Sequence, residues 1–107
     1  MDETEMKVFQ IISISGDSRA QAFEALRMAR KGDFAGADAK MEEARKTSAQ
    51  VHNLQTDMLT EEARGNKTPV GLLMVHAQDH LMTSLLARDL IEEMIGMLKD
   101  KQVEEED

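Results

Sequence analysis

Residues 34–58 read FAGADAKMEEARKTSAQVHNLQTDM, and their spacing decides the fold class. Apolar and small residues recur there at alternating steps of three and four, the heptad spacing of a helix that is packed along its length. The opposite face is rich in Asp, Glu, Lys and Arg, as a solvated face is. We therefore predict one long helix with a single buried side. Its periodic positions are Phe34, Ala37, Met41, Ala44, Ser48, Val51, Gln55 and Met58.

Two short breaks flank this helix and divide the chain into three segments. In Lys31-Gly32-Asp33, the glycine suits a left-handed helix C-terminus and the aspartate suits the next N-cap. In the second break, Thr68 suits an N-cap and Pro69 fits the first helical position. The segments predict an all-α, antiparallel three-helix bundle. The predicted helices span about residues 3–31, 34–64 and 69–100, in a single domain of residues 1–103.

The third segment carries two apolar stripes where a surface helix needs one. Leucine, isoleucine, valine and methionine occupy nearly every direction around it between Val70 and Leu98. In a protein with only two other helices, the second stripe predicts that this helix packs against copies of itself. The acidic run Glu104–Asp107 that follows is predicted to be disordered.

The composition excludes several classes of function. The chain has 107 residues, enough for one domain, and its 13 basic and 21 acidic residues give a net charge of 13 − 21 = −8. That balance, with only three aromatic residues, argues against a nucleic-acid partner. Because the chain has no cysteine, disulfides, thiolate metal sites and a cysteine nucleophile are excluded.

No segment predicts insertion into a membrane. The N-terminus is acidic and lacks the apolar core of a signal peptide. The longest uninterrupted apolar run is Leu72–Val75, far shorter than the roughly 20 residues of a membrane-spanning helix. We expect a cytoplasmic protein.

A polar group interrupts the apolar pattern of the third segment. His76, Asp79, His80 and Thr83 lie at positions i, i+3, i+4 and i+7, so they share one helical face. Ionisable groups on an apolar helix are costly to bury, and their clustering indicates a function or a role in setting register. Asp79 by itself would suit a register device in a seam between helices.

Three hypotheses fit this cluster, and the spacing leaves all of them open. In the first, His76, Asp79 and His80 bind a metal, although the general-base Glu of a hydrolytic His-Glu-x-x-His site is missing. In the second, a histidine is a nucleophile that accepts a labile group covalently and passes it on. In the third, the protein is a non-catalytic helical adaptor or a regulatory paralogue.

The same residues resemble a known family. Residues 75–84, VHAQDHLMTS, and 86–91, LARDLI, are similar to the enzyme IIA components of the bacterial phosphoenolpyruvate-dependent sugar phosphotransferase system, lactose/N,N′-diacetylchitobiose class. The resemblance spans about residues 5–100. Shorter matching stretches are SGDSR at 15–19, GDFA at 32–35 and HNLQT at 52–56.

This resemblance implies a three-helix subunit that assembles as a homotrimer through its third helix. It implies that the phosphocarrier protein HPr transiently phosphorylates His76, and that the group then passes to a cysteine of the cognate IIB domain. It also implies that the carboxylate of Asp79 lies on the threefold axis and holds a divalent cation, typically Mg²⁺. Gln78 and His80 are candidates to position the imidazole or bind the phosphoryl oxygens. We expect the site to lie between subunits, where an adjacent chain can supply His80.

The resemblance also bears on the transported sugar and on two polar residues of the second segment. Ala77 and residues 86–88 are more similar to chitobiose and cellobiose members than to lactose members, so among β-linked disaccharides they favour cellobiose or chitobiose over lactose. The sugar itself does not touch this component. We interpret His52 and Gln55 as residues that form hydrogen bonds between helices.

Overall fold

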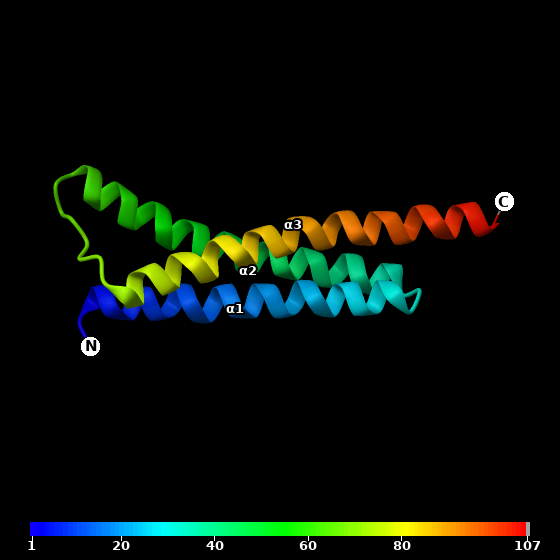
Figure 1. The fold of residues 1–107 in the computed structure, drawn as a ribbon, viewed down its shortest axis with the longest axis horizontal. Helices are drawn as coiled ribbons and strands as arrows, with labels where there is room; N and C mark the ends of the chain where they lie inside the picture. Colours follow the sequence, from blue (N-terminus) through cyan, green and yellow to red (C-terminus); the bar gives the residue numbers. More distant parts are fainter. Residues whose placement is uncertain (107) are drawn as a thin grey trace.

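The computed structural model describes residues 1–106 as three long helices. Helix α1 spans Glu3–Arg30, α2 spans Phe34–Ala63 and α3 spans Leu72–Glu106. α1 and α2 run antiparallel and α3 crosses over both, in an elongated molecule of 60 × 23 × 20 Å (Figure 1). The all-α, three-helix prediction is confirmed, and the first two helices match their expected bounds to within one residue.

The turn between α1 and α2 follows from its local sequence. Gly32 has a φ of +86°, a left-handed conformation that glycine adopts without strain. The Asp33 carboxylate then accepts a hydrogen bond of 2.9 Å from the Gly36 N–H and caps α2. This short turn makes α1 and α2 an antiparallel pair, as the sequence predicted.

Helix α3 begins at Leu72, three residues later than predicted. Thr68 and Pro69 therefore lie in an irregular connection, and the first helical bond runs from the Val75 N–H to the Gly71 carbonyl at 3.1 Å. The carbonyl of Gly71 accepts this first bond, so Gly71 takes the N-cap position, one of those that glycine favours. The predicted Thr68 cap is wrong, because Gly71 caps the helix instead.

The start of that connection is held by Glu61, near the end of α2. Its carboxylate accepts hydrogen bonds from Asn66 Nδ2 at 2.9 Å and from Arg64 Nη1 at 2.8 Å. These donors, the Asn66 amide above all, hold the pKa of the Glu61 carboxyl below its usual value. The contacts close the turn after α2 and direct the chain toward α3.

The C-terminal end of α3 also differs from the prediction. We expected residues 104–107 to be disordered, but the helix continues through Glu106, while Asp107 lies outside the described residues. No glycine or proline follows Gly96, and Lys, Gln and Glu propagate a helix well. As a result, α3 projects past the α1–α2 turn (Figure 1).

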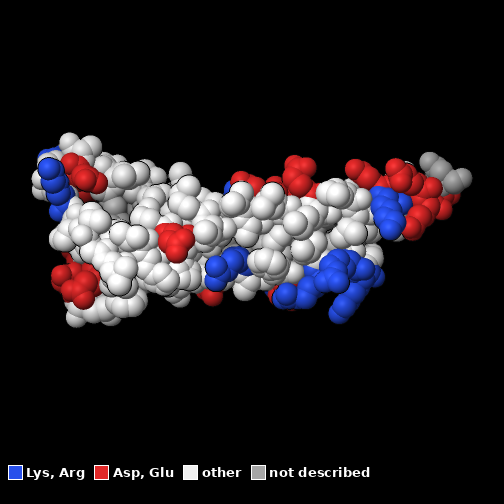
Figure 2. Space-filling view, viewed as in Figure 1, with Lys and Arg blue, Asp and Glu red and all other residues white. Residues whose placement is uncertain are grey.

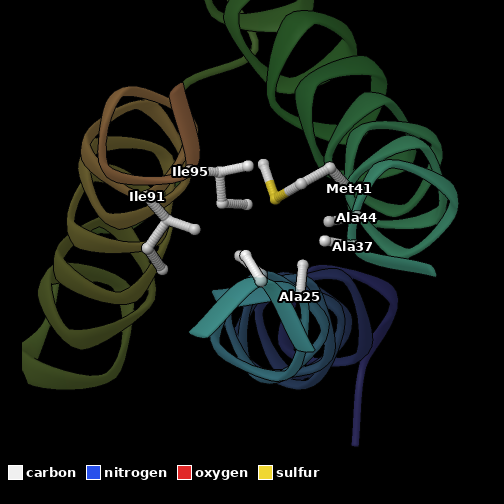
Figure 3. Packing of buried hydrophobic residues seen from close by; sticks show 8 residues of the cluster. Ala25, Ala37, Met41, Ala44, Ile91 and Ile95 are labelled. Carbon is white, nitrogen blue, oxygen red and sulfur yellow. The ribbon is translucent and has the colours of Figure 1, made fainter. Parts of the chain in front are cut away.

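Two hydrophobic clusters lie along the bundle. In the first, small alanines of α1 and α2 face Ile91 and Ile95 of α3, and Met41 reaches toward Ile95 between the helices (Figure 3). The second lies toward the N-terminal end of α3, where the second half of α2 diverges from the bundle (Figure 1). Its buried members are Val8, Ile11, Val51, Met74, Ala77 and Leu81.

A layer of buried serines separates the two clusters on every helix. Ser18 Oγ donates to the Ala44 carbonyl at 3.0 Å and lies 2.6 Å from Ser48 Oγ, which donates to it in turn. Ser15 on α1 and Ser84 on α3 are equally buried, but their hydroxyls have no hydrogen-bond partner among residues 1–106. The middle of the bundle is therefore polar and only partly satisfied.

We expect Ser84→Ala to stabilise the fold, because it removes a buried hydroxyl that has no partner. Leaving such a group unsatisfied costs about 1–3 kcal/mol, so the free energy of unfolding should rise by about 1 kcal/mol. Ser18→Ala is the matched control. It deletes a hydroxyl that is hydrogen-bonded, and the free energy of unfolding should fall by about 1 kcal/mol. Chemical denaturation at one protein concentration measures both, and an equal loss in the two variants would contradict this account.

Candidate functional site

The N-terminal half of α3 carries the two predicted site histidines. Because the helix is continuous there, side chains four residues apart lie one turn above each other on the same face. His76 is exposed and His80 is half-buried. Their Nε2 atoms are 3.1 Å apart, and their rings meet edge to face with centroids separated by 4.4 Å. The structure thus pairs these histidines within one chain.

Burial assigns the donor in this pair. Nδ1 of His80 is buried and has no hydrogen-bond partner in the described part of the chain. A proton there would be a buried donor without an acceptor, which is rarer in proteins than an unused acceptor. The proton of neutral His80 therefore belongs on Nε2, from which it donates to Nε2 of His76. In that arrangement the lone pair of His76 Nε2 faces His80, and it is the candidate nucleophile.

Asp79 lies on the same side of α3, and its carboxylate is exposed. Its carbonyl oxygen accepts a 2.7 Å hydrogen bond from Thr83 Oγ1, so Thr83 serves the helix backbone rather than either imidazole. Between residues 72 and 87, Asp79 is the only Asp, Glu, Lys or Arg. The surface over this part of α3 is accordingly almost uncharged (Figure 2).

Large apolar side chains surround Asp79 on the exposed side of α3. We call them the α3 apolar strip; they follow the three- and four-residue spacing of a helix–helix seam, with Asp79 filling the one polar position. Leu72 is 86% exposed and Leu86 is 58% exposed, although leucine side chains are usually buried. An exposed apolar surface of this extent marks an interaction site. The strip consists of Leu72, Val75, Met82, Leu86, Leu90, Met94 and Met97.

Gln78 lies on the other side of the helix. Two residues correspond to about 200° of rotation in an α-helix, so its side chain points away from His76. Its Oε1 accepts a 2.6 Å hydrogen bond from Gln55 Nε2 of α2, and its amide lies 3.8 Å from Met74 Sδ. Both glutamines line a mainly apolar groove of about 280 Å³ between the end of α2 and the start of α3. Within one chain, Gln78 joins α3 to α2 and does not join the histidine pair.

The interpretation of Gln55 as an interhelix hydrogen-bonding residue is confirmed by this contact. His52 is exposed on α2. No three His, Asp or Glu side chains among residues 1–106 are placed to hold a metal ion within one chain. The intrachain chelate of His76, Asp79 and His80 therefore does not form. The three side chains share a face without converging on one point.

Comparison with known proteins assigns the family. A family model described as the lactose/cellobiose-specific IIA subunit of the PTS system matches residues 6–99. The chain belongs to this family. The lactose-specific EIIA component of the PTS system from Lactococcus lactis subsp. lactis is 43% identical over 101 residues, which cover 92% of this chain and 96% of the relative. The N,N′-diacetylchitobiose-specific EIIA component from Escherichia coli K12 is 46% identical over 96 residues, covering 90% and 83% respectively.

Solved structures of IIA components agree with this assignment. The crystal structure of the cellobiose-specific enzyme IIA from Bacillus anthracis has a TM-score of 0.93 at 39% identity and covers 96% of this chain and 94% of its own. The IIA(chitobiose)–HPr complex from Escherichia coli gives a TM-score of 0.82 at 41% identity and covers 95% and 99%. The family resemblance is confirmed, and the chain is the IIA component of a sugar phosphotransferase system. In residues 1–106, none of the helices of this IIA component combines the length and apolar character of a membrane span.

Proposed function

We propose that this IIA component accepts a phosphoryl group from HPr on His76 and passes it to a cysteine of the cognate IIB domain. The observation that supports this best is the exposed His76 imidazole, whose Nε2 lies 3.1 Å from Nε2 of His80. The Escherichia coli relative described as a complex with HPr supports HPr as the donor. Such a carrier turns over only together with its two partners.

The chemistry needs little beyond positioning and charge stabilisation. The lone pair of His76 Nε2 attacks phosphorus in line with the bond to HPr, a P–N bond forms, and HPr leaves with the electron pair of the broken bond. Negative charge spreads over the phosphoryl oxygens during this transfer. We propose that the His80 Nε2–H, which lies beside His76 Nε2, exchanges its bond to His76 for a charge-assisted bond to a phosphoryl oxygen.

The second transfer reverses the first with a different acceptor. A thiolate of IIB attacks phosphorus, the P–N bond breaks, and its electron pair returns to His76 Nε2. The acceptor cysteine must belong to a partner, because this chain contains no cysteine. We propose that Gln78 acts indirectly in both steps, since its bond to Gln55 fixes this turn of α3 against α2.

We propose that the subunits assemble as a homotrimer along the α3 apolar strip. The strip exposes side chains that would be buried in such a seam, and its spacing is that of a coiled coil. Because His76 lies one residue beyond Val75 of the strip, the phosphoryl site would lie at the edge of the seam, between subunits. Light scattering from a folded particle near 12.0 kDa would contradict this assembly.

The proposed trimer would bring three Asp79 carboxylates together near its axis. Three like charges repel unless a cation or shared protons offset them. Carboxylate oxygens are the donors that Mg²⁺ prefers, and the exposed Asp79 carboxylate is free to supply one from each chain. The three Asp79 carboxylates thus fit a divalent cation, which would neutralise the charge of the seam.

We propose a β-linked disaccharide, cellobiose or chitobiose rather than lactose, as the transported sugar. The support is local, in Ala77 and residues 86–88, since overall identity to the lactose and chitobiose relatives is similar at 43% and 46%. Binding of the partner IIB domain tests this choice. The cognate IIB should be the one encoded with a transporter of that sugar.

Intact-mass spectrometry tests the carrier function. We expect one acid-labile phosphoryl group per chain after incubation with phosphoenolpyruvate, enzyme I and HPr, and its loss when IIB is added. A chain that assembles normally but never gains the group would instead be an adaptor or regulatory paralogue. Tight metal binding without phosphoryl acceptance would favour the metal-binding alternative.

A further inference from the structure

We propose that the His76–His80 pair is also a binding site for a transition-metal ion of the Zn²⁺ or Ni²⁺ class, and that this ion and the phosphoryl group exclude one another. This site is distinct from the one at which Asp79 carboxylates would hold a hard cation such as Mg²⁺. The metal site itself stands on the geometry of the pair, whereas the exclusion rests on the function proposed above.

The distance between the two nitrogens fits a chelate. Zn–N bonds of about 2.0–2.1 Å place two cis nitrogen ligands about 2.9 Å apart at a right angle and about 3.3 Å apart at the tetrahedral angle. The Nε2 atoms of His76 and His80 are 3.1 Å apart, between these two values. Two histidines one helical turn apart on one face are also the pair of ligands in helical zinc sites. The distance therefore already suits a shared ion, although both rings would have to rotate from their hydrogen-bonded arrangement so that the two lone pairs converge on it.

The ligand type selects the class of metal. Imidazole nitrogen suits Zn²⁺, Ni²⁺ and Cu²⁺, whereas Mg²⁺ prefers oxygen. Because no third His, Asp or Glu in residues 1–106 completes the site, water would fill the remaining positions. Coordination through both Nε2 atoms moves the His80 proton to its buried Nδ1, which has no acceptor in the described chain. This cost makes the site weaker than a structural zinc site and keeps it reversible.

The exclusion follows from the electrons involved. The metal would use the same lone pair of His76 Nε2 that attacks phosphorus, and a phosphorylated Nε2 has no lone pair left to donate. Bound metal would also remove the His80 Nε2–H donor. A cell with excess free transition metal would thereby slow sugar uptake at this step.

Calorimetric titration of the unphosphorylated protein with NiCl₂, in buffer with excess MgCl₂, tests the site. We expect saturable binding that weakens by about tenfold or more in His80→Gln, which keeps the polarity but removes one ligand. His52→Gln is the matched control, since His52 is an exposed histidine on α2 and should not contribute. Affinity that is unchanged in His80→Gln, or lost in Asp79→Asn, would overturn the histidine site.

Transfer from purified phospho-HPr, with enzyme I removed, tests the exclusion. We expect NiCl₂ to slow phosphoryl acceptance, and the phosphorylated protein to show at least a tenfold weaker response to NiCl₂ in the titration. Equal rates with the site saturated would overturn the exclusion. Failure to accept phosphate without any metal would instead refute the carrier function, and the titration would still decide the metal site.

Discussion

Replacing His76 with glutamine is expected to abolish phosphoryl acceptance completely. Glutamine retains an exposed, polar and helix-compatible side chain, but its amide nitrogen has no lone pair that can attack phosphorus. The His76 side chain is exposed, so its loss leaves both hydrophobic clusters intact. Intact mass after incubation with phospho-HPr should show no adduct, while circular dichroism and thermal unfolding remain those of the unmodified chain.

Replacing His80 with alanine separates the nucleophile from its donor. Loss of one preorganised donor to a developing negative charge typically slows a reaction by about 10²–10³-fold. We therefore expect His80→Ala to slow the transfer by about 10²-fold and still to reach a full adduct on His76. An acid-labile adduct that persists in His76→Gln would place the acceptor elsewhere. A His80→Ala rate equal to that of the unmodified chain would remove His80 from the site.

The buried side of α2 was predictable from spacing alone. Ala37, Met41, Ala44, Ser48 and Val51 of the heptad pattern are all buried. The pattern then continues through Gln55 and Met58, which are only half-buried. Periodicity reports which residues share a face, but it does not report how close the neighbouring helix lies. The divergence of the second half of α2 could not be read from it.

The arrangement of the candidate site could be predicted where it depends only on helix geometry. One-turn spacing placed His76 and His80 together, because residues at i and i+4 meet on any straight helix. The rotation of about 200° between His76 and Gln78 was equally available from helix geometry, and it explains why Gln78 faces Gln55 instead. The late start of α3 was harder to predict, because Thr68 and Gly71 are both acceptable N-cap residues and the sequence does not choose between them.

The two apolar stripes of α3 are both present, but only one is covered within the subunit. Leu81, Ile91 and Ile95 belong to the covered stripe, and the α3 apolar strip is the other. A sequence can indicate an excess of apolar faces over available partners. It cannot indicate how many copies cover the remaining face, which is why the trimer is a proposal that rests on the family and on the exposed strip.

Replacing Asp79 with leucine is expected to preserve the proposed trimer and to make it more stable. The change completes the α3 apolar strip and removes three carboxylates from the seam. Exchange of buried charged groups for well-packed apolar ones stabilises assemblies by about 1–4 kcal/mol in favourable cases. Light scattering should still report three chains of 12.0 kDa, and the thermal unfolding midpoint at one fixed chain concentration should rise.

A chelator distinguishes the two ways in which Asp79 can act. If a cation neutralises the three carboxylates, EDTA should lower the midpoint of the unmodified trimer and leave that of Asp79→Leu unchanged. Asp57→Leu, which makes the same charge change on an exposed face of α2, should keep the full response to EDTA. Dissociation of Asp79→Leu into monomers would mean that the cation bridge contributes more to assembly than desolvating three carboxylates costs. Asp79 would then hold the trimer together, and the apolar strip alone would be too weak to do so.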